Sequence, residues 1–532
     1  MGSSLGKLLF GLEIEFGFTV SDDEGRRFSP QLALGSYLKL CAEMFVHLPG
    51  NGGQRLYLAN GSLLYPDLGH PELATAESSS PVSLLQSLRA GESMLAEVAA
   101  ELDFKNGIGS VGLYRTNVDY SAIGTTWGSH ESYLSRHDPE SFAPKVVGHL
   151  VSRIIFTGSG GFNNRSRGAT FMLSPRVSHL NDTIGRDGAG TRAIFSLRDE
   201  PLSSECHHRV HLICGEPNCS ELSTYLRIGT TALVLAMADA SVDFGMSENW
   251  LTSPLATMRQ FSRDPECKKR TICGDRTRRT ALDIQRHYLE LAEMHCNAPF
   301  MPAWAEEVCI KWREVLVKLE DNPVDLIGSL DWPTKLALFK QHVKTRSTLS
   351  WGSLVVWTKI VACVSKAFAT ETEPWSRVNS MQIKSLLRNK GETARLLKGL
   401  TRTLDKHDLD WTELDAFQDI RDDLCELDIR YSQLYPRGIF IELEKAGQIR
   451  DGILVAGQIE EAIDRAPVEG RARVRGDWVR LLAKSPDKFS CDWTGILGEK
   501  VYLDLGDPFV TQATWQTRTE RERPQRRGVS SR

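Results

Sequence analysis

Long hydrophobic runs are absent from this 532-residue sequence: none reaches the roughly eighteen consecutive apolar residues that a membrane-crossing helix needs. Charge of one sign is not in excess either, because 64 lysines and arginines oppose 68 aspartates and glutamates, for a formal net charge of −4. Without an overall positive field, the composition does not predict binding to nucleic acid. The start of the chain, Met1–Phe10, is too short for a signal peptide and lacks a cleavage site. We therefore predict a protein that binds neither membrane nor nucleic acid.

Paired cysteine spacing is also missing. The chain has 11 cysteines, an odd number, scattered without the regular spacing of a disulfide framework. This usage predicts free thiols in a reducing compartment, and hence a cytoplasmic location.

Hydrophobic residues make up 41% of the chain and charged residues 25%, which are ordinary values for a globular protein. Strand-like patterns dominate the first part of the chain and helical patterns the next, which predicts an α+β fold with helices packed on one face of an antiparallel sheet. The expected strands begin with Leu12–Phe16 and Leu63–Pro66, the second of which ends at Asp67. They continue with Gly112–Arg115, Ile154–Thr157, Thr170–Leu173, Ile194–Leu197 and Val210–Cys214. The expected helices are Pro81–Leu102 (with Ser79–Ser80 as its cap), Ser220–Ala240, Thr280–His295, Trp304–Glu320 and Pro333–Val343.

The length allows two domains, or one large domain with an appendage. We predict a main domain over residues 1–455, with a helical insertion at 353–419, and a small domain over 456–514 with a helix at 475–484 and strands at 494–497 and 500–505. Residues 515–532 form a basic tail that lacks apolar periodicity and is predicted to be disordered.

Two carboxylates stand out on the first strand. Leu12, Ile14 and Phe16 alternate with Glu13 and Glu15, so both acids point to one face, about 6–7 Å apart at the usual rise per residue. That spacing suits two magnesium ions near a polyphosphate. A solvent-facing strand edge would give the same pattern.

A second acidic group lies in the segment LYPDLGHPELATAE, residues 64–77, which carries Asp67, His70, Glu72 and Glu77. An aspartate at the end of a strand, with histidine and glutamate close by, predicts a general base beside a metal site. The alternative is a polar turn that enters a helix, with Glu77 as an acid of the first helical turn.

Two segments could bind phosphate. FTGSGGF, residues 156–162, is rich in glycine but lacks the Gly-Lys-Ser/Thr of a Walker A loop. TRAIFSLRDEP, residues 191–201, offers Arg192 and Arg198, which could neutralise a phosphoryl group during transfer. For residues 156–162 we favour a plain loop. For the arginines, the alternative is a surface arginine paired with Asp199 or Glu200.

Residues 205–221 concentrate possible metal ligands, but their spacing fits no standard zinc site. We favour a single ligand, His211, on a strand that faces the same cavity as Glu13. The candidate ligands of the zinc alternative are Cys206, His207, His208, His211, Cys214 and Cys219.

Taken in order along the chain, these segments resemble the family of Pup ligases (proteasome accessory factor A) and Pup deamidase/depupylases, which act on the prokaryotic ubiquitin-like protein Pup. The resemblance rests on motifs along nearly the whole chain, except residues 353–419 and the tail. They include GLEIEFG, NGSLLYPDLGHPELATAE, NVD, GSHESYL, SLRDEP, VHLICGEPNCSE, STYLRIGTTALVL, DWPTKLAL, LDIRYSQL, GRARVRGDW and CDW.

The resemblance implies a glutamine-synthetase-like curved antiparallel sheet packed with helices, a small C-terminal domain, and an enzyme that uses ATP and Mg²⁺ to act on a glutamyl side chain. It implies Asp67 as the catalytic residue. It also implies magnesium ligands at Glu13, Tyr65 and Glu72, further cavity residues at Glu15 and His211, and ATP contacts at Thr75 and Trp493, to which the phosphate-neutralising Arg198 is added. Where the family usually has an ATP-binding arginine, this chain has Leu63, which weakens one nucleotide contact unless a neighbouring arginine replaces it.

The resemblance leaves the activity open. The deamidases carry a long loop between the first strand and the Asn-Gly segment, and only Phe18–Ala59 intervenes here, so we favour a ligase that joins the C-terminal glutamate of a Pup-like modifier to lysines of target proteins and thereby serves the bacterial proteasome. ATAE and RGIF are ligase-like, whereas DWPTKLAL and GTTALVL are deamidase-like. The alternatives are a deamidase/depupylase, a small-molecule glutamate–amine ligase, and a Pup-binding relative without activity.

Overall fold

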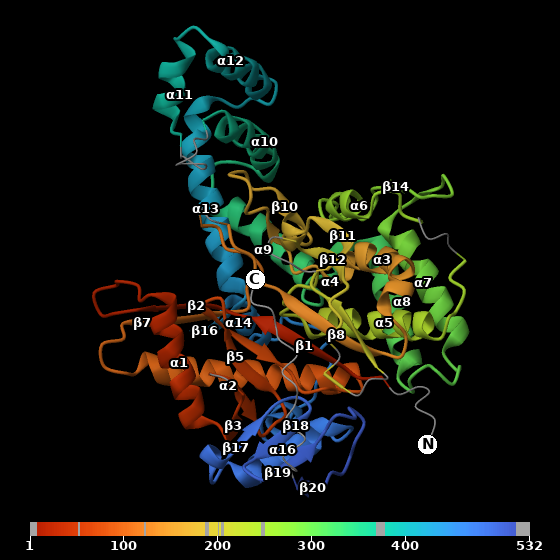
Figure 1. Ribbon diagram of the computed structural model, residues 1–532. Coiled ribbons are helices and arrows are strands. Elements are labelled where there is room, and N and C mark those ends of the chain that lie inside the picture. The colour runs from red at the N-terminus through yellow and green to blue at the C-terminus, as the bar shows by residue number, and fades with distance from the viewer. Residues whose placement is uncertain are drawn as a thin grey trace.

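The computed structural model describes residues 8–51, 54–121, 124–186, 191–200, 202–203, 207–245, 250–368 and 378–517. Figure 1 shows three parts: a body in which helices flank a large sheet, an arm of helices that projects from the body, and a small unit of C-terminal residues at the other end. The predicted disorder of residues 518–532 lies outside the described residues.

A nine-stranded sheet forms the centre of the body, in the order β11-β12-β13-β8-β1-β6-β5-β4-β3. Neighbouring strands are antiparallel except β11 and β12, which run parallel. The strands are β1 (Phe10–Glu15), β3 (His47–Pro49), β4 (Leu56–Leu58), β5 (Leu63–Asp67), β6 (His70–Ala74), β8 (Ser129–Ser135), β11 (Asp182–Gly185), β12 (Ala193–Ser196) and β13 (His208–Leu212).

Smaller sheets extend the body. They are formed by β2 (Gly17–Ser21), β7 (Ser110–Tyr114) and β16 (Gln433–Tyr435), by β9 (Gly161–Phe162) with β10 (Phe171–Met172), and by β14 (Thr271–Ile272) with β15 (Arg278–Arg279). The helices of the body are α1 (Pro30–Met44), α2 (Pro81–Asp103), α3 (Ala143–Ser152), α4 (Ile154–Thr157), α5 (Glu221–Asp239), α6 (Pro254–Phe261), α7 (Ala281–His295), α8 (Ala305–Asp321), α9 (Asp331–Arg346) and α14 (Ile439–Lys445).

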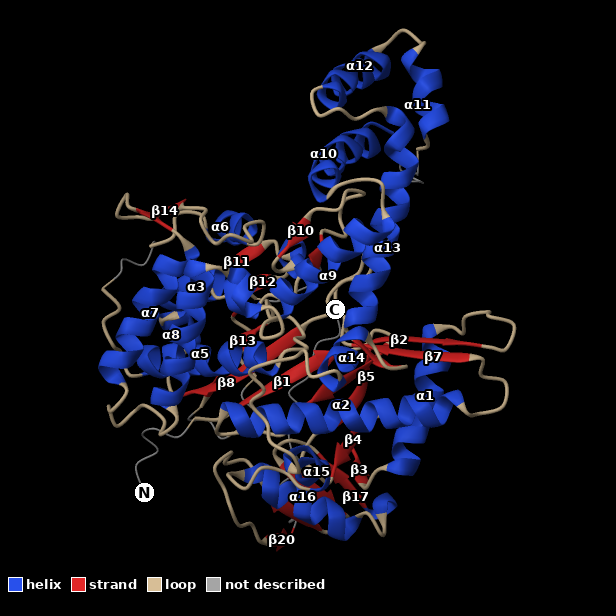
Figure 2. Cartoon of the chain, turned by 180° about the vertical axis from the view of Figure 1, so that it is seen from behind, coloured by secondary structure: helices blue, strands red, loops and turns tan. Residues whose placement is uncertain are grey.

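The alternation of β1 divides the sheet into two faces. Leu12 and Ile14 are 1% and 2% exposed and belong to the main hydrophobic core, whereas Glu13 and Glu15 are half-buried on the other face. Helix α2 crosses the apolar face of the sheet (Figure 2). It begins where predicted because the Ser80 side chain accepts the backbone N–H of Ser83, and because Pro81 needs no partner for an amide hydrogen. The opposite face is left free for polar side chains.

One predicted strand is wrong. Residues Ile154–Thr157 form helix α4, directly after α3, and Ile154, Ile155 and Phe156 are buried in the main core with α4 packed against α5. A short apolar run has no periodicity that separates a buried strand from a buried helix, so packing decides. The other expected elements are present, with small shifts at their ends.

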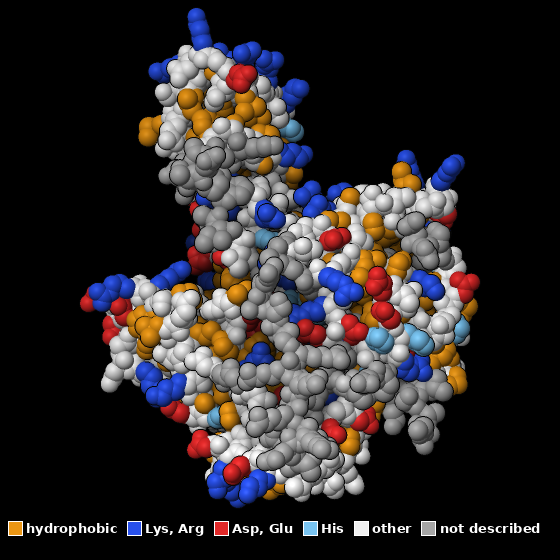
Figure 3. All heavy atoms as spheres, in the orientation of Figure 1, with side chains coloured by type: hydrophobic (Ala, Val, Ile, Leu, Met, Phe, Trp, Pro, Cys, Tyr) orange, Lys and Arg blue, Asp and Glu red, His pale blue; other side chains and the backbone are white. Residues whose placement is uncertain are grey.

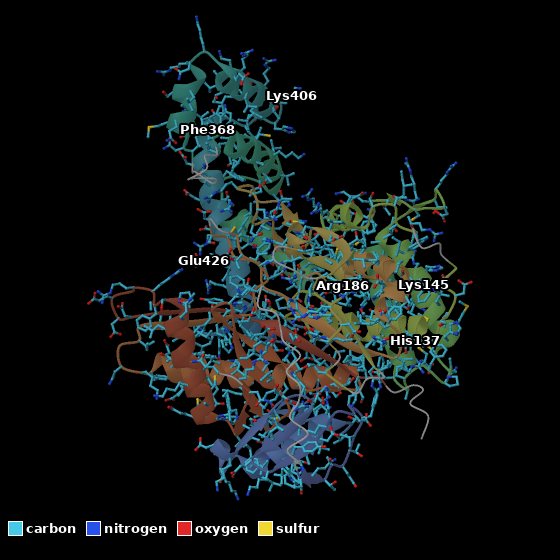
Figure 4. All side chains as sticks on the ribbon, in the orientation of Figure 1. His137, Lys145, Arg186, Phe368, Lys406 and Glu426 are labelled. Carbon is cyan, nitrogen blue, oxygen red and sulfur yellow. The ribbon has the colours of Figure 1, made fainter. Side chains whose placement is uncertain are left out.

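The described residues of the expected insertion are helical, as predicted. They form α10 (Trp351–Phe368), α11 (Ser380–Leu387), α12 (Glu392–Asp405) and the first part of α13 (Leu414–Tyr431), whose other end packs on α9. The arm has a hydrophobic cluster of its own, with Trp357, Leu397 and Phe417 fully buried. Lysine and arginine side chains gather on its outer end (Figure 3), and Lys406 lies there (Figure 4).

The C-terminal unit contains α15 (Gln458–Asp464), α16 (Arg471–Leu482) and the sheet β17 (Phe489–Cys491), β18 (Gly495–Gly498), β19 (Val501–Asp504) and β20 (Trp515–Thr517). The predicted start of the tail at residue 515 is wrong, because Trp515 of β20 pairs with Leu503 of β19 and packs edge-on against Trp478. We retain the division into a catalytic domain of residues 1–455 and a small domain from residue 456 as a proposal.

Within the described ranges, no single helix has the length and apolar composition to cross a membrane. Helix α9 and the first part of α10 together pass this criterion, but they are bent by 98° at the break between them.

We predict that the buried ion pair of Arg153 with Glu131 is critical for folding. Its nitrogen and oxygen lie 2.6 Å apart, and the side chains are 2% and 0% exposed. Arg153→Met leaves the Glu131 carboxylate buried with one cation fewer, so the free energy of unfolding should fall by about 3–5 kcal/mol, measured by urea denaturation. The exposed pair Arg186–Glu140 serves as control, and Arg186→Met should change stability by less than about 1 kcal/mol. Equal effects of the two substitutions would contradict the prediction.

Candidate active site

A cavity of about 600 Å³ opens over the polar face of the central sheet. Its floor is formed by β1, β5, β6, β8 and β13, and its rim includes residues 191–200 and residues 492–494 of the C-terminal unit. The structure brings most of the residues predicted from the sequence to this one cavity: Glu13, Glu15, Tyr65, Asp67, Glu72, Arg198, His211 and Trp493.

Strand register explains why the acids meet. Glu72 of β6 is paired with Glu15 of β1 on one side and with Tyr65 of β5 on the other. Directly opposed residues point to the same face of a sheet, and Glu13, two residues from Glu15, shares that face. The Tyr65 hydroxyl and the Glu72 carboxylate also influence each other's pKa. These four side chains therefore form a continuous group across three strands.

The charges in this group are unequal. Burial, reinforced by the negative charge of Glu13, raises the pKa of Glu72 to about 8. Burial would also raise the pKa of Glu13, but the neighbouring His130 ring, 3.7 Å away, and the charge of Arg209 hold it well below its usual range. The Arg209 guanidinium lies 2.9 Å from the Glu13 carboxylate. The charge of Glu13 is thus neutralised by protein cations, whereas Glu72 would need an added cation to be charged at neutral pH.

A set of possible metal ligands lies between β1, β8 and β13. One ligand atom from each of Glu13, His130 and His211 lies within 4.8 Å of the others. His211 is 4% exposed, and neither of its ring nitrogens has a hydrogen-bond partner. Burial and the nearby Arg209 charge hold the pKa of His211 well below its usual value, so the ring is neutral and can donate a lone pair. Carboxylates and neutral imidazoles fit a divalent cation.

Asp67 lies at the rim of the cavity, at the end of β5. A two-residue turn of Leu68 (φ +41°) and Gly69 (φ +95°) leads to His70, which is paired with Asp67. The Asp67 carboxylate is 39% exposed and lies 3.9 Å from the His70 ring, and one ligand atom from each of Glu15, Asp67 and His70 forms a second set within 4.8 Å. Burial raises the pKa of Asp67, and His70 partly offsets this shift. Asp67 is therefore the most exposed acid among Glu13, Glu15, Asp67 and Glu72.

A second, smaller cavity of about 110 Å³ adjoins the first at the end of β6. Thr75 lines it, is 3% exposed, and accepts the backbone N–H of Leu12 at 3.1 Å. Trp493 borders both cavities, with its ring edge-on to Tyr57 at a centroid distance of 5.8 Å. The two residues expected to contact ATP thus lie together at one end of the acid group.

Glu77 joins the C-terminal unit to the sheet. Its carboxylate lies 2.7 Å from Arg471 and 2.6 Å from Arg475, both on α16. The Arg475 guanidinium lies over the Trp493 ring, 4.6 Å from its centroid. The alternative interpretation of Glu77 as an acid of the first helical turn is wrong, because α2 begins only at Pro81. The ion pair of Glu77 instead orients Trp493 beside the small cavity.

Three residues that line the cavity were not predicted from the sequence as functional. His130 is on β8, where the alternation of the segment GSHESYL could have placed it on the polar face. Arg176 is 2% exposed yet lines the cavity, and its guanidinium is held by the backbone oxygen of Ile213 at 2.9 Å. The third residue is Arg55. No periodic pattern in the sequence marks either Arg176 or Arg55. Arg192 and Arg198 line the cavity as expected, and Arg198 also pairs with Glu200 at 3.0 Å.

Two alternatives that the sequence left open find no support among the described residues. None of residues 156–162 borders either of the two cavities just described, and Gly160 instead packs closely against Trp332. The possible metal-ligand sets among the described residues contain no cysteine, so they do not support the zinc alternative. Cys206 lies outside the described residues. His208 pairs with Asp199 at 2.7 Å, while Cys214 contacts Arg153 in the core.

Acids and imidazoles on the open face of a sheet, with arginines around them, are typical of enzymes that transfer phosphoryl groups. The model of the Pup-ligase family, "Pup-ligase protein", matches residues 8–359 and 358–497, so the chain belongs to this family of enzymes. The resemblance stated from the motifs is confirmed.

Two groups of relatives match to different extents. The "Pup--protein ligase" of Paenarthrobacter aurescens is 28% identical over 513 residues, 94% of this chain and 94% of that protein. The "Depupylase" of Acidothermus cellulolyticus is 35% identical over 317 residues, 57% of this chain and 61% of that protein. A solved structure, the complex between Pup and its ligase PafA, has a TM-score of 0.70 and 24% identity, and covers 95% of this chain and 90% of that one. The fold expectation is confirmed.

We predict that His211 contributes to divalent-cation binding. His211→Ala should weaken Mn²⁺ binding by about tenfold or more, measured by electron paramagnetic resonance with Mn²⁺ as a probe of the Mg²⁺ site. It removes a neutral ring whose nitrogens have no hydrogen-bond partner among the described residues. His137, which is 60% exposed and lies away from the cavity (Figure 4), provides the control His137→Ala. Unchanged Mn²⁺ affinity in His211→Ala would assign the ring to packing.

We also predict that Glu77→Gln loosens the C-terminal unit. The two arginines hold the pKa of Glu77 at about 2 despite the opposing effect of burial, so its contribution to stability is present above the unfolded pKa of about 4.5 and is lost as pH falls toward 2. The difference in urea midpoint between the parent and Glu77→Gln should therefore be large at pH 7 and shrink below pH 4.5. A difference that stays constant down to pH 3 would exclude this charge effect.

Proposed function

We propose that the chain is an ATP- and Mg²⁺-dependent ligase that joins the C-terminal glutamate of Pup to lysine side chains of target proteins. The observation that carries the proposal is Asp67 at the open rim of a cavity whose floor gathers Glu13, Glu72 and His211. Membership of the Pup-ligase family supports the choice of modifier.

The reaction has two steps. The terminal phosphoryl group of ATP is first transferred to the side-chain carboxylate of the glutamate, which gives an acyl phosphate and ADP. A lysine amine then attacks the acyl carbon, phosphate leaves, and an isopeptide bond forms as the amine loses its proton. Each step develops negative charge on phosphoryl oxygens, which nearby cations offset.

The side chains of the cavity fit these demands. Glu13, Tyr65, Glu72, Glu15 and His211 would hold magnesium, which supplies positive charge beside the phosphates. The arginines that line the cavity lie around this group and would neutralise the same charge: Arg176, Arg192 and Arg198.

Asp67 acts at the rim. Its carboxylate is partly open to solvent, so a lysine from another protein can approach it without entering the floor of the cavity. There it accepts the proton of the attacking amine, since only a neutral amine is a nucleophile. Thr75 and Trp493 would bind the nucleotide in the adjoining small cavity.

Depupylation is the second candidate, because the depupylase relative is more identical over the part that aligns. The ligase relative aligns along 94% of both chains, however, and the described residues between β1 and Asn60 are largely occupied by β2, α1, β3 and β4. We therefore favour ligation. As part of this proposal, target proteins and the bacterial proteasome are downstream partners, and the enzyme is cytoplasmic, in line with ten described cysteines that are all free.

We predict that Asp67→Asn abolishes conjugation while leaving ATP binding intact. The substitution keeps the shape of the side chain and removes its basicity, which typically lowers the rate by about 10²–10⁴-fold. The test measures ATP affinity and the rate of lysine conjugation on one preparation, with Pup ending in Glu. Asp321→Asn on α8 is the control and should change neither quantity.

The same assay with Pup ending in Gln separates the two candidates. ATP-dependent conjugation of the Glu form supports the ligase, whereas release of ammonia from the Gln form without conjugation would replace it with the depupylase. A conjugation rate within a few-fold of the parent in Asp67→Asn would remove Asp67 from the mechanism.

A further inference from the structure

Arg55 places a positive charge over the ring of Tyr65, on the β4 side of the acid group. It directly precedes β4, in which Leu56 pairs with Leu64 and Tyr57 with Leu63 of β5. This register sets Arg55 opposite Tyr65, and the central carbon of its guanidinium lies 5.7 Å from the centroid of the Tyr65 ring. The face of the Tyr65 ring therefore supports the guanidinium.

The backbone around Arg55 is closely fixed. Gly50 donates its N–H to the Arg55 carbonyl at 2.8 Å. A Cβ at position 50 would lie 2.8 Å from the Arg55 Cβ and 3.1 Å from the Tyr57 ring, so only glycine allows this approach without displacement. The first part of the Arg55 side chain therefore has a defined starting point at the rim of the cavity.

Arg55 is also available for a ligand. Its side chain is exposed within the cavity lining, and no described carboxylate lies within 4.0 Å of its guanidinium. Two of the other cavity arginines already have acidic partners: Arg209 pairs with Glu13, and Arg198 with Glu200. Thus Arg55 carries a charge that no described acid compensates.

The cavity floor beside Arg55 carries the apolar side chain of Leu63, and Arg475, which lies over the Trp493 ring, is already paired with Glu77. Leu63 is 3% exposed and belongs to an apolar cluster with Tyr57 and Ala74, against which Trp493 packs. This apolar floor extends from the acid group toward the small cavity that Thr75 and Trp493 border. An anionic chain that extends from the small cavity to the acid group would pass over Leu63 and contact the Arg55 guanidinium.

We infer that Arg55 binds the polyphosphate chain of the nucleotide, and that it supplies from β4 the cation which Leu63 cannot supply from β5. The inference rests on the proposed ATP-dependent function. A planar guanidinium forms two parallel hydrogen bonds to a phosphate group, so it fixes the position of the chain as well as offsetting its charge. Arg55 is thus a substrate-positioning residue of the nucleotide site.

The test is calorimetric titration of ATP with Mg²⁺ into the full-length chain and its Arg55→Gln variant, followed by steady-state kinetics of conjugation. Loss of a charge-assisted hydrogen bond should weaken ATP binding by about tenfold to a hundredfold and raise the KM for ATP similarly, with less effect on kcat. The KM for Pup should stay unchanged. Arg55→Lys keeps the charge but not the planar pair of donors, so its ATP affinity should lie between those of the parent and Arg55→Gln.

Arg395→Gln on α12, in the distant arm, is the matched control and should leave ATP affinity at the parental value. Unchanged ATP affinity in Arg55→Gln would overturn the inference and leave the proposed function intact. A raised KM for Pup with unchanged ATP affinity would also overturn it, by assigning Arg55 to an acidic segment of the protein substrate. Failure of the parental chain itself to bind ATP would overturn both the inference and the ATP-dependent function.

Discussion

Negative charge held on the middle strand of a sheet is the constraint around which the site is built. Glu13 and Glu15 project from β1, where two neighbouring strands and the cavity walls limit their access to water. Buried carboxylates remain ionised only beside cations. Arg209 and His130 meet this need for Glu13, and the opposing pKa shifts of Glu13 and Glu72 show that the protein's own cations serve only part of the group. When the site binds cations and phosphates together, the remaining negative charge of the acid group is neutralised.

The second dependence is between the sheet and the C-terminal unit. Strand β6 carries Glu72 to the acid group, and the chain that follows it carries Thr75 to the small cavity and Glu77 to the arginines of α16. Three successive functions thus follow from six residues of one extended segment. Because Arg475 contacts both Glu77 and the Trp493 ring, the position of the indole depends on an ion pair that links the C-terminal unit to the sheet.

Sequence reasoning succeeded where the signal is local. The alternation of β1, the Ser80 cap of α2 and the strand end at Asp67 each depend on neighbouring residues, and each is present in the structure. It failed at Ile154–Thr157, where packing against α5 decides the conformation, and it missed Arg55, Arg176 and His130. Local alternation could have placed His130 on the polar face, but no short window of sequence shows which strands bring these residues to one cavity. Long-range pairing decides this, such as Glu13 of β1 with His130 of β8 and Leu56 of β4 with Leu64 of β5.

The turn after Asp67 has a consequence for the choice of acceptor. Leu68 is 95% exposed at the tip of a two-residue hairpin, so the rim beside Asp67 is a narrow apolar point rather than a broad surface. A lysine that projects from a convex part of a folded protein can pass this point, whereas one recessed in a groove is kept away by its own surroundings. Acceptor choice under the proposed ligation would then follow local surface curvature more than the amino acids that flank the lysine.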